Sequence, residues 1–528
     1  MDRIVLQSLA AGIFLSLLYI TVTVYIHLFR SPLRTIPGPK LFALTKWRLA
    51  YEDYRGTRTT TMHRLHERYG NVVRIGPREV SFNSLSAQRT IYGAGTVFQR
   101  DDFYRMFDAY GRQIMFSFAS SKHHRERKKL LSHAYSKTSV LSPRNVVMIE
   151  EKARQFLDLI EKEAKKGNLE TFAALHYFSM DSITKFLYGI SPGETAALAS
   201  SSQDRSLLND ILDPARRKLS WFTIHFPALT HWLYSQTGLL ESLLTYLDML
   251  PMRKPSTYSG IRKHALAAAE HLDKSDTQTL AANESIAAQL LLAIRHSDSK
   301  GASPGMDYLD VASECADHLL AGIDTTSDTT MWAMFALSQP ENHHFQAKLR
   351  AEVRALGEEY TVDRIVSAVA ADKLPYLDAV IKETLRLFAP LPGTEPRRSE
   401  NDHVIDGCLI PKGTVVSISP YTLHRNPRVF KDPMRFNPDR WLGPAAEVAE
   451  MKRWFWAFSS GGRMCIGMHL AMAEMTTLLA SVYRSYQTEI APAFQGVSPG
   501  VTARYEVFSD EHFEKIEEHV CWVKFITG

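Results

Sequence analysis

The stretch FSSGGRMCIG, residues 458–467, decides the fold, because it places one of the chain's four cysteines in a loop of small residues. Cys465 stands there with three glycines, an arginine and a phenylalanine around it. Three roles are open to such a cysteine. It could serve as an inert buried thiol, as a nucleophile with a nearby histidine base, or as the thiolate ligand of a haem iron.

The composition of the loop favours the haem ligand. Gly461 and Gly462 permit unusual backbone dihedral angles and let a large planar group come close. Gly467 lets the next helix begin close to the cysteine, so that the positive end of the helix faces the thiolate. Arg463 supplies a cation for a haem propionate, and Phe458 can shield the sulfur from water.

FSSGGRMCIG resembles the haem-binding signature of the cytochrome P450 family, Phe-x-x-Gly-x-Arg-x-Cys-x-Gly, at every fixed position. The resemblance implies a mainly α fold with small β-sheets, the cytochrome P450 fold, and haem b as the cofactor. It also implies that Cys465 is the axial ligand of the haem iron. The residues that it implies beside the cofactor in this loop are Phe458, Gly461, Arg463 and Gly467.

A second landmark of the family is a Glu-x-x-Arg helix, and Glu383 and Arg386 match it. The spacing puts both side chains on one helix face. Four other Glu-x-x-Arg pairs occur, but only this one lies in an apolar helix followed by APLPG. PDRW, residues 438–441, is similar to the family motif that supplies a second arginine. The resemblance implies a buried structural triad of Glu383, Arg386 and Arg440 behind the cysteine loop.

The third landmark is AGIDTT, residues 321–326, inside an otherwise apolar helical run. A glycine within a helix costs roughly 1 kcal/mol relative to alanine, and neither a surface helix nor a capping site at Asp324 accounts for this cluster. The resemblance implies that Ala321 and Gly322 leave room for dioxygen above the iron. It implies that Thr325 hydrogen-bonds the oxygen and that Asp324 relays protons.

Three further side chains are expected at the haem propionates. KHHRERKK, residues 122–129, aligns with a family helix that normally offers a tryptophan and an arginine, and His124 and Lys128 stand in those places here. A solvated basic helix face is the alternative for this segment. Arg397 resembles another propionate arginine of the family, with Arg398 as its competitor.

The N-terminal segment predicts a membrane anchor. Residues 4–29 contain no Lys, Arg, Asp or Glu, and about 20 apolar residues suffice to cross a bilayer. A cleaved signal peptide would have a shorter apolar core. Basic residues follow the segment, so the positive-inside rule places the body in the cytosol. We expect a single-pass anchor at residues 1–29 in the endoplasmic reticulum membrane, a Pro-containing linker at 30–62 and a haem domain at 63–528.

Strand patterns flank the helical middle of the chain. VVRIGPREVSF, residues 72–82, predicts two strands joined by a Gly-Pro turn, and residues 404–419 predict a hairpin. The run from about residue 120 to residue 342 is mostly helical in pattern. These patterns favour one mostly helical domain over two separate folds.

The family resemblance implies a monooxygenase, which puts one atom of O2 into a substrate and releases the other as water. The expected electron source is NADPH through a membrane-bound reductase, because the chain has no GxGxxG or Walker-type motif of its own. The net charge of +5 is small for 528 residues and gives no electrostatic basis for binding nucleic acid.

The expected substrate is a lipophilic small molecule. Residues 103–118, 211–226 and 391–394, with the helix before Gly322, should line an apolar pocket. The similarity to membrane-anchored members from filamentous fungi suggests an intermediate of secondary metabolism. Two rival functions stay open, a haem-thiolate isomerase or dehydratase and a non-enzymatic haem sensor. The intact Asp324-Thr325 pair argues against both, because neither needs an oxygen-activating relay.

Overall fold

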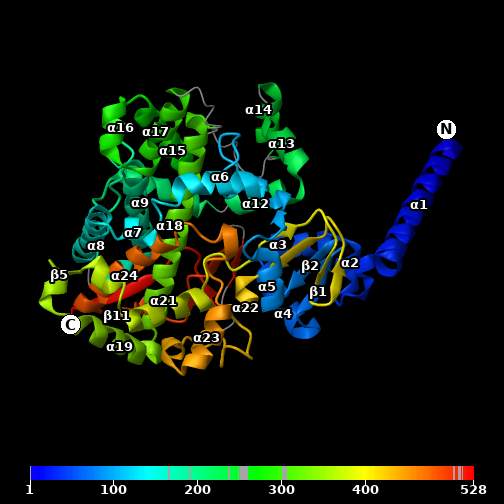
Figure 1. The fold of residues 1–528 in the computed structure, drawn as a ribbon. Helices are drawn as coiled ribbons and strands as arrows, with labels where there is room; N and C mark the ends of the chain where they lie inside the picture. Colours follow the sequence, from blue (N-terminus) through cyan, green and yellow to red (C-terminus); the bar gives the residue numbers. More distant parts are fainter. Residues whose placement is uncertain are drawn as a thin grey trace.

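The computed structural model describes residues 2–164, 167–189, 192–213, 215–235, 238–247, 249, 260–299, 306–503, 506–508, 513 and 515–527. Met1 of the predicted anchor and residue 214 of a predicted pocket segment lie outside these ranges. A helical body carries one long helix, α1 (Asp2–Tyr25), which projects away from it at the N-terminal end (Figure 1). The mainly α fold with small sheets is therefore confirmed.

Helix α18 (Tyr308–Ser338) runs through the body and is its longest helix among the described residues. Asp307 caps its first turn by accepting a hydrogen bond from the Asp310 N–H, and the Asp310 carboxylate accepts one from the Asp307 N–H. The other long helices of the body are α6 (Ser121–Leu131), α8 (Pro143–Glu163), α9 (Thr171–Tyr188), α15 (Gly260–Asp273), α17 (Ile286–Ser299), α19 (His343–Arg354), α21 (Pro375–Leu387) and α24 (Met468–Ser485).

Most side chains of α18 are buried, because helices pack on several sides of it. The closest packing is against α9, with α15, α21 and α24 on other sides. Shorter helices include α5 (Leu85–Tyr92), η3 (Asp102–Phe107), α12 (Ala215–His225), α13 (Pro227–Ser235), α14 (Leu239–Tyr246), α16 (Thr277–Asn283), α22 (Pro420–Leu423), η8 (Pro438–Leu442) and α23 (Ala445–Trp454).

Five strands form the main sheet in the order β1-β2-β10-β7-β3. They are β1 (Val72–Gly76), β2 (Glu79–Phe82), β10 (Val415–Ile418), β7 (Arg397–Arg398) and β3 (Gln99–Arg100). The antiparallel pair β1–β2 confirms the two strands predicted at residues 72–82. A second sheet has the order β11 (Tyr486–Ile490), β16 (Trp522–Thr527), β4 (Asn168–Glu170).

The hairpin predicted over residues 404–419 is only partly right. Strand β8 (His403–Ile405) pairs with β9 (Cys408–Ile410), whereas β10 leaves the hairpin and runs parallel to β2. The tight turn forms at Asp406 and Gly407, which both have positive φ, at 49° and 75°. A two-residue Asp-Gly turn closes a short hairpin, so the next strand is free to join the main sheet.

Residues 40–69, most of which we expected in a linker, are folded onto the body. They form α2 (Lys40–Leu44), α3 (Trp47–Arg55) and α4 (Arg58–Tyr69). Their apolar side chains pack with strand β1 in one cluster, which contains Phe42, Leu49, Met62, Val73 and Ile75. Gly38, in the sequence IPGP at residues 36–39, allows close packing here, because a Cβ at this residue would lie 2.3 Å from the carbonyl oxygen of Arg74.

One described helical segment, Ala11–Arg30, is long and apolar enough to cross a membrane, and none of it is buried in the body. Its C-terminal end is held to the sheet by Arg74, whose Nη1 donates to the His27 carbonyl at 2.9 Å. The Nη2 of Arg74 donates to Ser31 Oγ at 3.3 Å. Length and composition thus suggest a membrane anchor, and its exit from the body is fixed by hydrogen bonds.

Candidate functional site

The cysteine loop folds back on itself through two backbone hydrogen bonds. The N–H of Cys465 donates to the Phe458 carbonyl at 2.9 Å, and the N–H of Met464 donates to the Gly461 carbonyl at 3.2 Å. Gly461 has φ 65° and begins the 3₁₀ turn η9 (Gly461–Arg463). A Cβ there would lie 2.2 Å from the Tyr92 carbonyl oxygen, so only glycine lets the loop approach α5 this closely.

Cys465 lies two residues before Gly467, the N-cap of helix α24. The surface of Cys465 is accessible to solvent, yet burial is the main influence on the thiol and raises its pKa. The backbone N–H groups of Gly467 and Met468 and the charge of Lys128 act in the opposite direction. Gly467 caps α24, and a Cβ at this residue would meet no atom within 4 Å. The helix N-terminus therefore favours a thiolate beside open space.

Five basic side chains gather beside the loop: Arg100, His124, Lys128, Arg397 and Arg463. Burial lowers the pKa of His124 to about 3, and the charges of the other four add to this effect. Burial, followed by the neighbouring charges of Arg100 and Arg397, likewise lowers the pKa of Arg463 to about 9. The Glu395 carboxylate lies near, 3.3 Å from Arg397 Nη2. The region is strongly positive and suits an anionic ligand.

The sequence analysis missed Arg100. It is 6% exposed, and its Nε and Nη1 have no hydrogen-bond partner among the described residues. Its guanidinium lies over the rings of Tyr104 and Phe116, at 4.4 and 4.2 Å from their centroids. In the register of β3 and β7, Arg100 stands opposite Arg397. No local pattern marks Arg100, because this pairing joins segments almost 300 residues apart in the chain.

Strand alternation decides between the two arginines of β7. Arg397 is 2% exposed, and its Nη1 donates to Tyr104 Oη at 3.0 Å. Arg398 instead pairs with Asp101 and has a half-exposed side chain. Because successive side chains of a strand point to opposite faces, only Arg397 turns toward the basic cluster.

Arg463 and Lys128 also brace the loop through backbone carbonyls. Arg463 donates from Nη1 to the Phe118 carbonyl and from Nη2 to the Ala119 carbonyl, both at 2.7 Å. Lys128 Nζ donates to the carbonyls of Gly462 and Met464, at 3.0 and 3.2 Å. The two cations thus tie the loop to α6 and to the segment before it.

Ala321 marks an open face in the middle of α18. It is exposed, although the helix around it is mostly buried, and Asp324 and Thr325 one turn later are half-buried. Thr325 Oγ1 donates to the Ala321 carbonyl at 2.9 Å. The hydroxyl proton is therefore engaged, and the oxygen lone pairs remain able to accept a hydrogen bond.

Gly322 has a packing role that the sequence did not indicate. A Cβ at this residue would lie 2.6 Å from Cγ1 of Ile183 on α9. Ile183 thus occupies the space that a side chain at residue 322 would need. The absence of that side chain lets α9 and α18 pack closely. Of the two small residues expected to leave room for dioxygen, Ala321 is the one on the open face.

The three charged residues behind the loop meet in one buried network. Glu383 is fully buried, and its carboxylate accepts from Arg386 Nε at 2.9 Å and from Arg440 Nε at 3.1 Å. Arg386 Nη1 donates to the His424 carbonyl at 2.9 Å, and His424 Nε2 accepts from the Trp456 N–H at 2.8 Å. Trp456 lies two residues before the loop, so the network supports the loop from behind.

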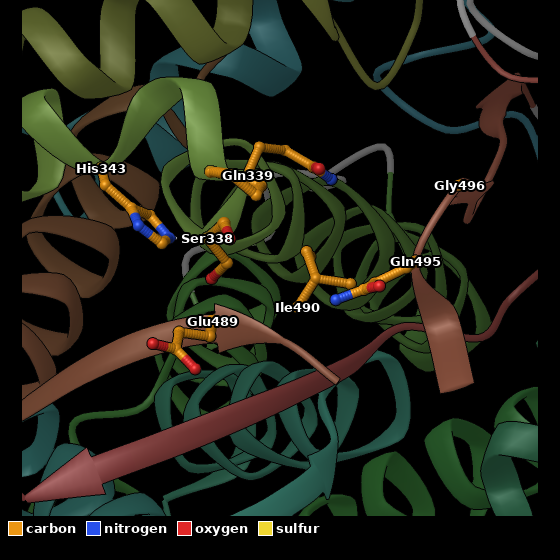
Figure 2. A pocket seen from close by; sticks show the side chains of 8 residues that line it. Ser338, Gln339, His343, Glu489, Ile490, Gln495 and Gly496 are labelled. Carbon is orange, nitrogen blue, oxygen red and sulfur yellow. Dashed lines mark hydrogen bonds between the residues drawn. The ribbon is translucent and has the colours of Figure 1, made fainter. Parts of the chain in front are cut away.

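A separate pocket lies at the C-terminal end of α18 (Figure 2). Its volume is about 370 Å³, and its lining residues are Ser338, Gln339, Pro340, His343, Glu489, Ile490, Gln495 and Gly496. None of the residues predicted for the site lines this pocket. The residues predicted for the site therefore lie outside this pocket.

Comparison with known proteins decides the family. The family model for cytochrome P450 matches residues 37–498. The chain belongs to the cytochrome P450 family. Members of this family are oxidoreductases that bind haem through a cysteine thiolate, and Cys465 is the cysteine in the matching loop.

Curated relatives of this cytochrome P450 are fungal monooxygenases of secondary metabolism. Cytochrome P450 monooxygenase aflV from Aspergillus parasiticus is 28% identical over 86% of this chain and 84% of its own length. Averantin hydroxylase from Dothistroma septosporum is 27% identical over 92% of this chain and 86% of its own length. Tryptophan 6-hydroxylase fscE from Fusarium equiseti is 29% identical over 88% of this chain and 87% of its own length.

The basic cluster fits a haem, whose two propionates are anionic. We expect Arg100→Gln to shorten haem retention, because a charge-assisted hydrogen bond is worth about 1.5–3 kcal/mol. Haem loss to an excess of apomyoglobin should become roughly 10-fold to 100-fold faster. The apoprotein should be stabilised at the same time, because a buried cation is removed whose Nε and Nη1 have no hydrogen-bond partner among the described residues. Arg398→Gln, on the outward face of β7, is the matched control, and equal rates for both variants would contradict the assignment of Arg100.

Proposed function

We propose that the chain is a haem-thiolate monooxygenase that holds haem b and oxygenates a lipophilic small molecule with electrons from NADPH. The observation that carries the proposal is the placing of Cys465 in front of the α24 N-terminus with five basic side chains beside it. When bound, a haem with a cysteine ligand supplies the chemistry of dioxygen activation. The side chains of this chain would bind the haem, position the cysteine loop and transfer protons.

Cys465 would hold the iron, and Arg100, His124, Arg397 and Arg463 would hold the propionates. Arg397 is kept in place by Tyr104, and Arg463 by two backbone carbonyls, so both cations have fixed positions. Lys128 has a different proposed role. Its Nζ is bound to the loop carbonyls, so it positions the loop and favours the Cys465 thiolate by its charge.

Thr325 and Asp324 would handle protons on the opposite side of the site. With its own proton donated to the Ala321 carbonyl, the Thr325 hydroxyl can accept a hydrogen bond in the open space beside Ala321. Asp324, the preceding residue, would supply protons there. This pair favours a monooxygenase over the isomerase, dehydratase and sensor alternatives, which need no proton supply to dioxygen.

An aromatic cluster supports a lipophilic, ring-containing substrate. The ring centroids of Tyr104 and Phe116 are 5.4 Å apart, and those of Phe107 and Phe116 are 4.9 Å apart. This cluster surrounds Arg100 at the edge of the site. Two relatives are named as hydroxylases of averantin and of tryptophan. We infer a lipophilic substrate, an intermediate of fungal secondary metabolism.

The proposed electron donor is an NADPH–cytochrome P450 reductase in the same membrane. Lys129, Arg428 and Lys431 are exposed and would meet its acidic surface. The apolar helix at the N-terminus would hold the protein in the endoplasmic reticulum membrane, with the body on the cytosolic side. Reconstitution with the reductase tests the function. We expect NADPH consumption and oxygen-dependent product, whereas an isomerase would form product without NADPH and a sensor would form none.

Thr325→Ala should separate electron use from product formation. The variant keeps the cysteine loop and the basic cluster but loses the hydroxyl at the open face, so protons reach the oxygen less selectively. NADPH consumption should stay within about 2-fold, while product per NADPH falls at least about 10-fold and hydrogen peroxide rises. Thr330→Ala is the control, since Thr330 makes the same hydroxyl-to-carbonyl bond but is buried. Unchanged coupling in Thr325→Ala would favour the isomerase.

A further inference from the structure

Asp328 lies one turn beyond the Asp324-Thr325 pair on α18. Ala321, Asp324 and Asp328 follow each other at intervals of three and four residues, so they share one helix face. Asp328 is 8% exposed, and its Oδ1 has no hydrogen-bond partner among the described residues. A buried carboxylate with an oxygen that accepts no hydrogen bond is costly to keep ionised. The surroundings of Asp328 thus favour its neutral, protonated form.

His176 on α9 faces this carboxyl group. It is 1% exposed, and its Nε2 lies 3.9 Å from Asp328 Oδ1. Its Nδ1 lies 2.7 Å from the Phe172 carbonyl oxygen, which can only accept, so Nδ1 carries the proton. Nε2 is therefore the acceptor nitrogen of the ring, and it is the atom that lies 3.9 Å from Asp328 Oδ1. Two acceptors would face each other unless Asp328 is protonated, and a small side-chain shift would close the gap to a hydrogen bond.

The charges around Asp328 act in the same direction. Burial raises the pKa of Asp328 well above its usual value, and the neighbouring Asp324 raises it further. Burial lowers the pKa of His176 to about 3, so this imidazole is neutral, and His519 adds to the effect. His519 stands behind Phe172, at 5.1 Å between ring centroids, in the segment before β16. The described titratable groups toward α9 and α18 thus stabilise a proton on Asp328.

We propose that Asp328 is a proton-holding residue that reprotonates Asp324, with His176 as its hydrogen-bond partner. The proposal rests on the proposed monooxygenase function. Asp324 first gives its proton to the reacting oxygen at the open face of α18. The O–H bond of Asp328 then breaks, and an O–H bond forms on Asp324. Asp328 is then anionic until a proton from solvent water restores it, on the His176 and His519 side. The device supplies a second proton without opening the site to water.

Infrared spectroscopy tests the protonation state without turnover. The full-length, haem-loaded protein is compared with Asp328→Asn at neutral pH, in the absence of substrate and reductant. We expect the variant to lose one C=O stretching band of a buried protonated carboxylic acid. Ser327→Ala is the control, because Ser327 is also buried on α18 and its hydroxyl donates to the Ile323 carbonyl at 2.6 Å. An unchanged band pattern in Asp328→Asn would overturn the proposal.

Turnover measurements test the relay itself. In Asp328→Asn we expect product per NADPH to fall about 10-fold, within the range for positioned proton donors, and the solvent deuterium isotope effect on product formation to rise. Asp328→Glu should restore both values and shift the infrared band. If asparagine prevents haem loading, Asp328→Glu decides alone, and an unshifted band would overturn the proposal.

Failure of this proposal and failure of the proposed function are distinguishable. If Thr325→Ala uncouples turnover but Asp328→Asn keeps wild-type coupling and isotope effect, only the role of Asp328 is overturned. If the wild-type protein gives no NADPH-dependent product, the monooxygenase function fails, and with it the relay. The infrared band would then report a buried proton on Asp328 with no part in such a reaction.

Discussion

Cys465→Ala abolishes the strongly red-shifted Soret band of the reduced carbon-monoxide complex; this is the largest spectroscopic effect that we expect. A thiolate ligand causes that shift, and Cys465 is the cysteine at the N-terminus of α24. Its thiolate is favoured by the N–H groups of Gly467 and Met468 and by Lys128. Absorption spectroscopy after reduction and exposure to carbon monoxide measures the result.

The other cysteines provide the control for this prediction. Cys315 is fully buried inside α18, and burial raises the pKa of its thiol far above the usual value. Cys408 lies on strand β9 of the β8–β9 hairpin, paired with Ile405. Cys408→Ala should keep the red-shifted band. If Cys408→Ala removed the band and Cys465→Ala kept it, the assignment of the axial ligand would be wrong.

Glu383→Ala should yield apoprotein or aggregate. Five donors converge on this carboxylate: Arg386 Nε and Nη2, Arg440 Nε, the Asn437 N–H and Trp441 Nε1. Removal of the carboxylate leaves Arg386 buried and without its counter-charge, which costs about 3–5 kcal/mol. Such a loss is a large part of the total stability of a domain. Haem content and the thermal midpoint of the purified variant measure it.

The chain contains a matched control for this prediction. Glu450 and Arg453 form the same Glu-x-x-Arg pair at 2.6 Å, but their side chains are about half exposed. Glu450→Ala should change the stability by less than about 1 kcal/mol, because exposed ion pairs contribute little. Recovery of soluble, haem-loaded Glu383→Ala would show that the triad is dispensable.

The Glu383 network should also respond to pH. Burial opposes ionisation of Glu383, but the charges of Arg386 and Arg440 outweigh it and hold the pKa below its usual value. A group with a lowered folded-state pKa stabilises the fold above its unfolded-state pKa, and this contribution is lost as the pH falls through the folded-state value. The stability difference between wild type and Glu383→Gln should therefore shrink in acid.

Local patterns in the sequence were sufficient to find the family, the cysteine loop and the motif on α18. Each of these lies within ten consecutive residues, where spacing alone fixes which side chains share a loop or a helix face. The N-terminal apolar helix was visible for the same reason, since length and apolarity are local properties. The linker was misjudged, because Phe42 and Leu49 pack against β1, a contact that only the folded chain shows.

The sequence by itself singled out one cysteine, in a glycine-rich loop before an apolar helix, as the candidate haem ligand. Only the tertiary structure decided what surrounds it. The β3–β7 register places Arg100 opposite Arg397. The packing of α9 on α18 places Ile183 in the space beside Gly322. The same packing brings His176 close to Asp328. These contacts join segments that are distant in the chain, and no periodicity within either segment encodes its partner. Their energies come from burial, which exists only once the core has formed.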